Sequence, residues 1–353
     1  MTSGVVVVVG AGIVGASVAY HLARSGAAVA LIDRSLPGCG ATGESFGWIG
    51  DATGDWPGGA QDLRPHVLSE YSSLGEVLPL DVRWTGSLAW IAPAGGRGPR
   101  PPVLGPTQRL LDEEAVRRLE PSLRVAPDSA VHSATDGAVD PVSMTETLVR
   151  AARAHGAAVL FGGTVLDVRI RAGRVSGVST SVGELECAQV VLANGTDAPA
   201  LCAPLGTRLP VTSSPAVLLR LRARAGTVRT LIAHPEFEVR GVGGGHLVAT
   251  TTYGGETSSA ELAERGRRIA HSLTTVFGAS ARIRLDSVRV GMRPMPADGA
   301  PIVGWLDGVA GAYVAVAHSG VTLAPLLGRL VAEEILRATS APELARCRPS
   351  RFS

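Results

Sequence analysis

The sequence predicts an α/β fold in which a domain of alternating strands and helices is interleaved with a mainly antiparallel β (α+β) domain. Three observations support this prediction. A strand, a glycine turn, a helix and a second strand open the chain, short strand-like runs with turn glycines fill its middle, and a helical pattern closes it. At 353 residues the chain is also long for one simple domain, so two domains are expected.

The N-terminal glycine turn indicates what the first domain binds. The β-branched run Val5–Val9 leads into the letters GAGIVG, a helical segment follows, and a second strand ends at Asp33. In this pattern Gly10 makes the tight turn, Gly12 lets the backbone approach a pyrophosphate, and Gly15 allows close helix packing. The Asp33 carboxylate would accept a hydrogen bond from a ribose hydroxyl. The pattern predicts a Rossmann-like domain for FAD or NAD, and the glycine spacing leaves both open.

Charge and hydropathy exclude several classes of partner. The chain has 33 basic and 31 acidic residues, a net charge of +2, and no long run of one sign. This balance predicts no nucleic-acid or membrane-surface binding and favours a small-molecule ligand. The chain lacks an apolar run of about 18 residues, so no membrane span is expected. Because the apolar start lacks a basic region and is followed by glycine-rich turn signals, no signal peptide is expected either. The four scattered cysteines predict a protein of the reducing cytoplasm.

The residue types that are missing or scattered exclude further chemistry. All the basic residues are arginine, so a pyridoxal phosphate Schiff base and a catalytic lysine base are impossible. The cysteines are far apart and form no CxxC pair, so neither a metal site nor a disulfide framework is expected. They are Cys39, Cys187, Cys202 and Cys347.

Three helical segments are expected after the N-terminal unit. Asp140 precedes a proline and an amphipathic pattern, which predicts a capped packing helix. A second capped amphipathic helix is expected over residues 258–277, covering a sheet. The run Ala312–Ala317 reads as a strand, and the turn at His318 leads into a helix that begins close to Gly320. The N-terminus of this last helix would face whatever lies over the sheet.

Five separated motifs resemble, in sequence order, the D-amino-acid oxidase, glycine oxidase and sarcosine oxidase family of flavoproteins. The resemblance spans nearly the whole chain and is loose between about 211 and 285. It rests on the stretches GCGATGESFGWIG (38–50), DGAVDPVSMTETLVRAARAHGA (136–157), VVLANGTDA (190–198), GMRPMPADGAPIVG (291–304) and VAHSGVTLAPLLGRLVAEEI (316–335).

The resemblance implies FAD as the cofactor and a set of residues around it. Some relatives attach FAD through a histidine in the loop that matches Thr42–Gly47, or through a cysteine near the stretch of Arg293. This chain has Glu44 in the loop and no cysteine in that stretch, so noncovalent FAD is expected. A surface turn is the alternative for the loop, and Asn194 stands where the family usually has a small residue. The cofactor-binding residues expected are Gly10, Gly12, Ile13, Val14, Gly15, Asp33, Arg34, Thr42, Ser45, Gly47, Val165, Ala193, Asn194, Gly195, Gly320, Val321 and Thr322.

One arginine stands among glycines, prolines and apolar residues near the C-terminal end. In the resembling amine oxidases an arginine at this position pairs with the carboxylate of an amino-acid substrate, so Arg293 is expected to do the same. The alternative is a structural ion pair with Asp298 or Asp286.

The middle of the chain departs from the family pattern. Where relatives often have a tyrosine that touches the substrate, this chain has Glu238. Spacing of two places His234, Glu236, Glu238 and Arg240 on one face of an expected strand. If that face lines the pocket, Glu238 would favour a substrate with a second cationic group. If the face meets water, which we favour at this point, these are ordinary solvated charges.

His318 is expected near the flavin as a second positive group or as a neutral histidine that satisfies a turn. Some relatives use a lysine to speed the reaction with oxygen, and this chain has none. We therefore expect either a slow oxidase whose reoxidation depends on protonated His318, or a dehydrogenase with another acceptor.

The sequence thus predicts an FAD-dependent oxidoreductase that oxidises the Cα–N bond of an amino acid or N-substituted amino acid to an imine by hydride transfer. Its catalytic residues would be Arg293, His318 and Glu238, and oxygen is the expected acceptor. The alternatives are an FAD-dependent amino-acid dehydrogenase, an NAD-dependent oxidoreductase and a flavin-binding protein without turnover. The FAD-binding domain would comprise 1–80, 136–210 and 286–353, and the substrate domain 81–135 and 211–285. No feature specifies an oligomeric state.

Overall fold

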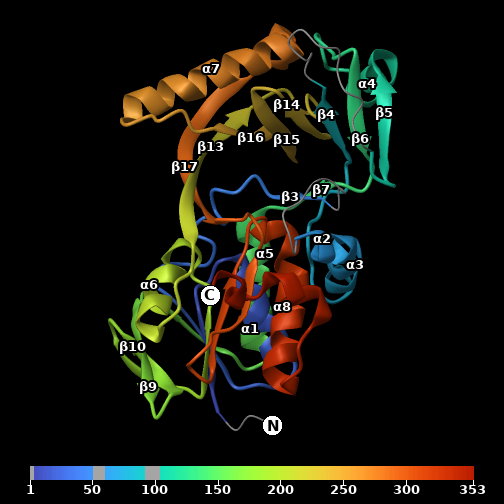
Figure 1. The fold of residues 1–353 in the computed structure, drawn as a ribbon. Coiled ribbons are helices and arrows are strands. Elements are labelled where there is room, and N and C mark those ends of the chain that lie inside the picture. Colours follow the sequence, from blue (N-terminus) through green and yellow to red (C-terminus); the bar gives the residue numbers. More distant parts are fainter. Residues whose placement is uncertain (1–3, 51–59, 92–103) are drawn as a thin grey trace.

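The computed structural model describes residues 4–50, 60–91 and 104–353. It has two halves that lie one above the other in Figure 1 and a cavity between them. The mixed α/β fold predicted from the sequence is confirmed. No helix within these ranges is long and apolar enough to cross a membrane.

A six-stranded sheet organises the lower half. Its central strands are parallel, and β18 at one edge is antiparallel. The strand order is β18 (Ile302–Trp305), β19 (Ala312–Val316), β12 (Gln189–Leu192), β1 (Val6–Val9), β2 (Val29–Asp33) and β8 (Ala158–Phe161). The two N-terminal strands and the C-terminal strand predicted from the sequence therefore lie in one sheet.

Both faces of this sheet are covered, which explains why its strands are continuously apolar. Alternate side chains of β1 enter two different cores: Val6 and Val8 pack toward the helices, and Val7 and Val9 pack toward a three-stranded sheet. The helices are α1 (Ile13–Arg24), α5 (Pro141–Ala154), α8 (Gly320–Arg337) and α3 (Val67–Val77). The smaller sheet has the order β11 (Gly183–Glu186), β10 (Arg174–Thr180) and β9 (Val165–Arg171), and α6 (Ala198–Cys202) lies beside it.

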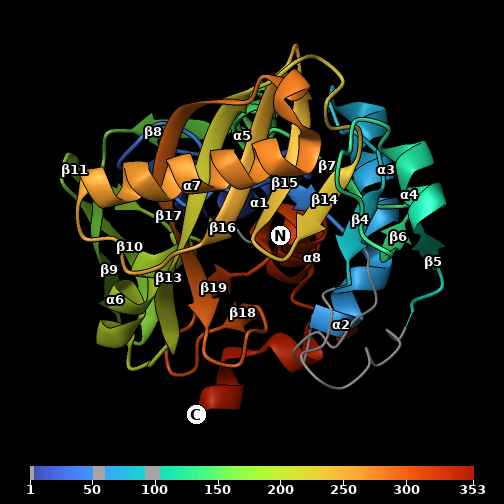
Figure 2. The same ribbon diagram turned by 90° about the horizontal axis from the view of Figure 1, so that it is seen from above.

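An eight-stranded, largely antiparallel sheet forms the upper half. Its order is β17 (Arg284–Pro296), β13 (Val211–Arg222), β16 (His246–Thr252), β15 (Phe237–Gly243), β14 (Leu231–His234), β4 (Ser87–Trp90), β6 (Ser129–Ser133) and β5 (Gln108–Asp112). The view from above shows α7 (Ser259–Phe277) lying across this sheet (Figure 2). Ile269 and Leu273 of α7 belong to the core on that face, so the opposite face is left for the cavity.

Two of the predicted helix starts are confirmed by their caps. Asp140 Oδ1 accepts a hydrogen bond of 2.9 Å from the Ser143 N–H at the start of α5. Ser258 Oγ accepts one of 3.2 Å from the Glu261 N–H at the start of α7. Each cap satisfies a backbone donor that the first helical turn leaves unpaired.

The expected strand through residues 234–240 is wrong in part. β14 ends at His234, a turn contains Glu236, and β15 begins at Phe237, because the chain reverses at this point to form a hairpin. Glu236 accepts a hydrogen bond of 2.6 Å from Ser272 on α7. Glu238 and Arg240 do share one face of β15, as the spacing of two requires.

The remaining elements connect the two halves. β17 spans the domain boundary predicted at 286 and pairs with β13 along its length. The short strands β3 (Trp48–Ile49) and β7 (Gly137–Ala138) pair between the halves. The other helices are α2 (Ala60–Leu63), α4 (Glu113–Leu119) and the 3-10 segments Arg64–His66, Gly195–Asp197, Ala203–Leu205, Ala279–Ala281, Pro342–Cys347 and Pro349–Phe352.

Candidate active site

A cavity of about 870 Å³ runs from the carboxyl end of β1 to the inner face of the eight-stranded sheet. Nearly all the predicted site residues line it. They are Gly10, Gly12, Ile13, Val14, Asp33, Arg34, Thr42, Ser45, Gly47, Val165, Ala193, Asn194, Gly195, Glu238, Arg293, His318, Gly320, Val321 and Thr322. The structure thus brings together residues from every predicted motif, while their individual roles stay predictions.

The glycine turn has the geometry that a bound phosphate group needs. Gly10 has a φ of +103°, and a Cβ there would lie 2.6 Å from the Ala193 carbonyl oxygen. Gly15 packs behind the turn, where a Cβ would lie 1.9 Å from the Gly10 carbonyl oxygen. A Cβ on Gly12 would meet only Thr42 Oγ1, at 3.3 Å, so this position faces the open cavity. The turn therefore leaves its backbone accessible on the cavity side.

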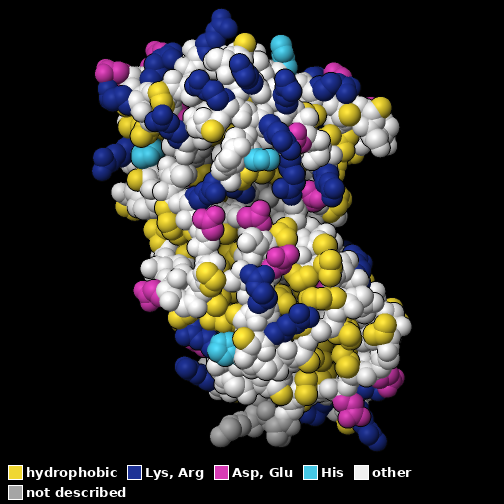
Figure 3. Space-filling model, turned by 180° about the vertical axis from the view of Figure 1, so that it is seen from behind, with side chains coloured by type: hydrophobic (Ala, Val, Ile, Leu, Met, Phe, Trp, Pro, Cys, Tyr) yellow, Lys and Arg dark blue, Asp and Glu magenta, His cyan; other side chains and the backbone are white. Residues whose placement is uncertain are grey.

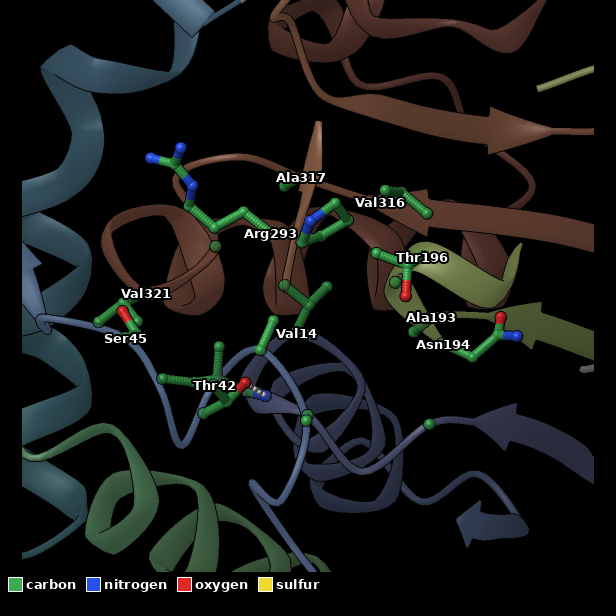
Figure 4. A pocket seen from close by; sticks show the side chains of 18 of the residues that line it. Val14, Thr42, Ser45, Ala193, Asn194, Thr196, Arg293, Val316, Ala317 and Val321 are labelled. Atoms are coloured by element: carbon green, nitrogen blue, oxygen red, sulfur yellow. Dashed lines mark hydrogen bonds between the residues drawn. The ribbon is translucent and has the colours of Figure 1, made fainter. Parts of the chain in front are cut away.

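Asp33 and Thr42 brace the turn from two sides. The Asp33 carboxylate accepts hydrogen bonds of 2.6 Å from the Ala11 N–H and 2.7 Å from the Ser35 N–H. Thr42 Oγ1 accepts one of 3.1 Å from the Ile13 N–H, the contact dashed in Figure 4. Each carboxylate oxygen keeps a further acceptor site, so Asp33 retains the capacity to bind a ribose hydroxyl.

Two helix N-termini face the cavity. α1 begins after Gly12 and α8 after Ser319, and neither helix has an acidic residue in its first turn. The start of α8 is held in place, because Thr322 Oγ1 donates a hydrogen bond of 2.9 Å to the Trp48 carbonyl oxygen and the Tyr71 hydroxyl donates one of 2.6 Å to the Val321 carbonyl oxygen. The positive ends of both helix dipoles are thus available to negative groups.

Asn194 and Arg34 both line the cavity, and Asn194 lies at its far end from Arg293 (Figure 4). Asn194 Oδ1 is buried and finds no hydrogen-bond partner within the described chain. Since a buried amide oxygen normally accepts a hydrogen bond, this atom is suited to a ligand donor. Arg34 forms a solvent-exposed ion pair of 2.9 Å with Asp197.

Arg293 lies at the opposite end of the cavity from Asn194 and Thr196 (Figure 4). It donates a hydrogen bond of 2.9 Å from Nη2 to Ser214 Oγ and one of 3.3 Å from Nε to the Ser214 carbonyl oxygen. Both acceptors are uncharged, and Arg293 forms no ion pair with any residue of 4–50, 60–91 or 104–353.

Arg293 forms neither of the two ion pairs offered as its structural alternative. Asp286 pairs with Arg222 at 2.9 Å, and Asp298 pairs with Arg351 at 2.8 Å. Both carboxylates that the sequence offered as partners are therefore bound elsewhere. Arg293 keeps a guanidinium that faces the cavity and can receive a planar anion.

Glu238 lines the cavity from β15, so the preferred reading of it as an ordinary solvated charge is wrong. Burial raises the pKa of its carboxyl, and the nearby Arg293 guanidinium offsets part of that rise. A buried acid is harder to ionise because it loses its hydration.

Arg240, the next residue on that face, clamps the loop that passes over the cavity. Its Nε donates a hydrogen bond of 2.6 Å to the Phe46 carbonyl oxygen, and its Nη2 donates one of 3.1 Å to that of Val139. The clamp joins the eight-stranded sheet to the loop that carries Thr42 and Ser45.

Of the two states that the sequence left open for His318, a positive group or a neutral histidine, its surroundings favour the neutral one. Burial and the nearby guanidinium groups of Arg293 and Arg64 lower its pKa from 6.5 to about 4. The imidazole is therefore neutral at physiological pH.

Sequence reasoning missed Arg64, which is 5% exposed and lines the cavity. It donates a hydrogen bond of 2.7 Å to the Gly50 carbonyl oxygen and one of 3.3 Å to Ser319 Oγ. Its hydrogen-bond partners lie far from it in the sequence, so no local motif could predict its position. The other lining residues that were missed include Trp48, Asp136, Ala216 and Thr250.

The described residues contain no group of three or more His, Cys, Asp or Glu side chains arranged to hold a metal ion. Together, the doubly covered parallel sheet, the glycine turn and the paired helix N-termini define a dinucleotide-cofactor protein with a second domain over the cofactor site. The chain belongs to the DAO family of FAD-dependent oxidoreductases, whose family model matches residues 6–334. This assignment confirms the predicted family and removes the NAD-dependent alternative.

Curated relatives carry several names. The chain is 27% identical to the uncharacterized oxidoreductase YurR of Bacillus subtilis, with 98% of each chain covered. It is 26% identical to a glycine oxidase of Bacillus licheniformis, over 94% of this chain and 92% of that one. It is 32% identical to a D-amino acid dehydrogenase of Cereibacter sphaeroides, over 64% of this chain and 54% of that one.

Solved structures share the fold along the whole chain. A glycine oxidase from Bacillus cereus superposes with a TM-score of 0.83 at 22% identity, covering 97% of each chain. An iminodiacetate oxidase from Chelativorans sp. BNC1 superposes with a TM-score of 0.80 at 25% identity, covering 98% of each chain.

Proposed function

We propose that this protein binds FAD noncovalently and oxidises the Cα–N bond of an amino acid or N-substituted amino acid, giving an imine that hydrolyses in water. The observation that carries the proposal is the Arg293 guanidinium at the far end of the cofactor cavity, bonded only to uncharged atoms of Ser214. Arg293 is half-buried, and a guanidinium that is withdrawn from water without a counter-ion is costly, so a substrate carboxylate would supply one. Relatives named as glycine oxidase and D-amino acid dehydrogenase support the same substrate class.

The cavity residues fit FAD. Gly10 and Gly12 leave the turn open toward a pyrophosphate, and the α1 N-terminus has no acidic residue to oppose one. The buried Asn194 Oδ1 can accept from a polar group of the cofactor. The N-terminus of α8 offers a positive dipole end to a ring that gains negative charge on reduction.

When bound, FAD would supply a two-electron acceptor for the hydride. The contribution of the protein chain is alignment: Arg293 would hold the carboxylate, and the eight-stranded sheet would close the cavity against bulk water. The α-amine must be uncharged when the hydride leaves, because a protonated amine has no lone pair to form the imine. Neutral His318 lies near Arg293 and adds no positive charge to oppose this.

Anaerobic mixing with amino acids tests the proposed function. The purified protein should carry a flavin absorption spectrum, and acid precipitation should release the flavin because we propose no covalent link. Bleaching by D-amino acids, glycine, N-methyl amino acids or proline-like imino acids would support oxidation at Cα–N. A flavin that none of these compounds reduces would contradict the proposal and favour an inert flavin-binding protein.

We propose oxygen as the electron acceptor, with a dehydrogenase as the second candidate because the D-amino acid dehydrogenases are among the relatives. Measuring hydrogen peroxide against dye reduction under air separates the two candidates. Since the chain has no lysine, Arg64 and Arg293 are the described cations nearest His318 that can favour the oxygen reaction.

Reoxidation should be insensitive to a histidine titration near neutral pH. Because the pKa of His318 is lowered to about 4, the imidazole is already neutral at pH 5 and stays so to pH 9. Stopped-flow mixing of the reduced protein with oxygen should therefore give rates without a step near 6.5, and His318→Asn should keep the same pH profile. A step near 6.5 that disappears in His318→Asn would restore the protonated-histidine route.

A further inference from the structure

Glu238 is a second unpaired charge at the substrate end of the cavity. Its carboxylate has no hydrogen-bond or ion-pair partner in the parts of the chain that the structure describes. Arg293 influences its pKa, so the two groups share one electrostatic environment, yet they do not form an ion pair. Two opposite charges therefore face the same space without neutralising each other.

The backbone positions of these two residues lie far apart in the eight-stranded sheet. Arg293 lies on β17 and Glu238 on β15, with β13 and β16 between them. Three strand spacings correspond to about 14 Å across the sheet. The two residues are also displaced from each other along the strands. Arg293 pairs with Ser214 of β13. Glu238 pairs with Thr250 of β16, and Thr250 in turn pairs with Leu218 of β13. The two charges thus enter the cavity from well-separated points.

The part of the sheet between Arg293 and Glu238 leaves room for a ligand. Ala216 of β13 and Thr250 of β16 line this stretch, and both side chains are small. Thr250 Oγ1 donates a hydrogen bond of 3.0 Å to the Val217 carbonyl oxygen, so the hydroxyl is held by the sheet. An extended chain can therefore lie along this wall from Arg293 toward Glu238.

We propose that Glu238 is a specificity-determining residue that selects substrates with a second cationic group, such as a guanidinium or ammonium at the end of an amino-acid side chain. This inference rests on the proposed function for the assignment of the carboxylate to Arg293. A dibasic amino acid would present one negative and one positive group to the two unpaired charges.

The chemistry argues against the α-amine as the partner of Glu238. A carboxylate that held the α-ammonium would stabilise its protonated form, which cannot react, and would raise the barrier. A side-chain cation keeps its charge from binding to product, so its ion pair with Glu238 lasts throughout the reaction. A desolvated charge pair of this kind improves discrimination by about 10- to 100-fold.

The experiment compares pairs of compounds that differ in one charge. Arginine is compared with citrulline and lysine with norleucine, each as both enantiomers, by the kcat/KM of flavin reduction. In the wild-type protein the cationic member of each pair should be preferred. Glu238→Gln should lower that preference about 10- to 100-fold, and Glu238→Asp should recover part of it. The matched control is Glu236→Gln, two residues before Glu238 in the exposed hairpin turn, which should keep the wild-type preference.

A binding measurement checks the same inference without turnover. 5-Guanidinovalerate has the carboxylate and the distal cation but no α-amine, and valerate lacks the cation. Quenching of tryptophan fluorescence, with Trp48 in the cavity wall, should show tighter binding of 5-guanidinovalerate, and Glu238→Gln should remove the difference.

The outcomes are distinguishable. If no amino acid reduces the flavin of the wild-type protein, but the protein binds 5-guanidinovalerate through Glu238, the proposed function is contradicted and the cation site is supported. Wild-type protein that oxidises amino acids with no preference for cationic side chains, or a preference unchanged in Glu238→Gln, would overturn the inference about Glu238. An equal loss of kcat on neutral and cationic substrates would also overturn it, because that pattern indicates proton removal from the α-amine.

Discussion

Arg293→Ala is expected to lower the kcat/KM of flavin reduction by about 30- to 1,000-fold, equivalent to about 2–4 kcal/mol of transition-state binding. The reason is geometric: the guanidinium faces the cavity with Ser214 as its partner, so a substrate carboxylate would form its charged pair. Rapid-mixing measurements of anaerobic flavin reduction give this quantity directly. Arg293→Lys should recover only part of the rate, since an ammonium does not match a carboxylate with two parallel hydrogen bonds.

Arg284→Ala is the control for that experiment. Arg284 lies on the same strand, β17, at an exposed position away from the cavity, so its removal should leave flavin reduction close to wild type. Wild-type kinetics in Arg293→Ala, with flavin content and folding unchanged, would show that the arginine has a purely structural role.

Gly12→Val and Gly15→Val are expected to fail in different ways. At Gly12 an added side chain projects toward the cavity beside Thr42, so the variant should fold but be isolated with little FAD. At Gly15 the first added carbon would lie 1.9 Å from the Gly10 carbonyl oxygen, so helix α1 cannot stay where it is and folding should suffer.

Two measurements separate these outcomes. The ratio of absorbance at the flavin band to protein absorbance reports FAD content, and the midpoint of thermal unfolding of the FAD-free proteins reports stability. A Gly12→Val protein with full flavin content would contradict the assignment of the turn to the cofactor. A Gly15→Val protein as stable as wild type would contradict the packing argument.

Much of the fold could be predicted from local patterns in the sequence. The glycine turn, the end of β2 at Asp33 and the caps at Asp140 and Ser258 each depend on a few neighbouring residues, and they form as predicted. The parallel sheet follows from them because a strand–helix–strand unit has essentially one arrangement.

The part of the cavity that contains Glu238 and His318 depends on contacts between distant residues, which local sequence patterns do not encode. The face of Glu238 could not be predicted, because the hairpin turn containing Glu236 interrupts what reads as one strand. The charge of His318 could not be predicted either, since Arg64 and Arg293 approach it from remote parts of the chain. The family resemblance supplied Arg293 but had no counterpart for Glu238.

On the face seen in Figure 3 the two halves differ in surface chemistry. Arginine side chains are scattered over the half built on the eight-stranded sheet, and hydrophobic side chains are more frequent on the half below. Several of the arginines form exposed ion pairs, such as Arg222 with Asp286 and Arg267 with Glu264. Such exposed pairs add little stability.

The interleaved path of the chain has a consequence for how the protein can be divided. The polypeptide passes between the six-stranded and the eight-stranded sheet four times: between β2 and β4, between β6 and β8, between β12 and β13, and between β17 and β18. No single cut can therefore release either half as a continuous, foldable fragment. Truncation from either end would remove strands from the six-stranded sheet before it removed the other half, and a nascent chain must emerge almost completely before β18 and β19 can join that sheet.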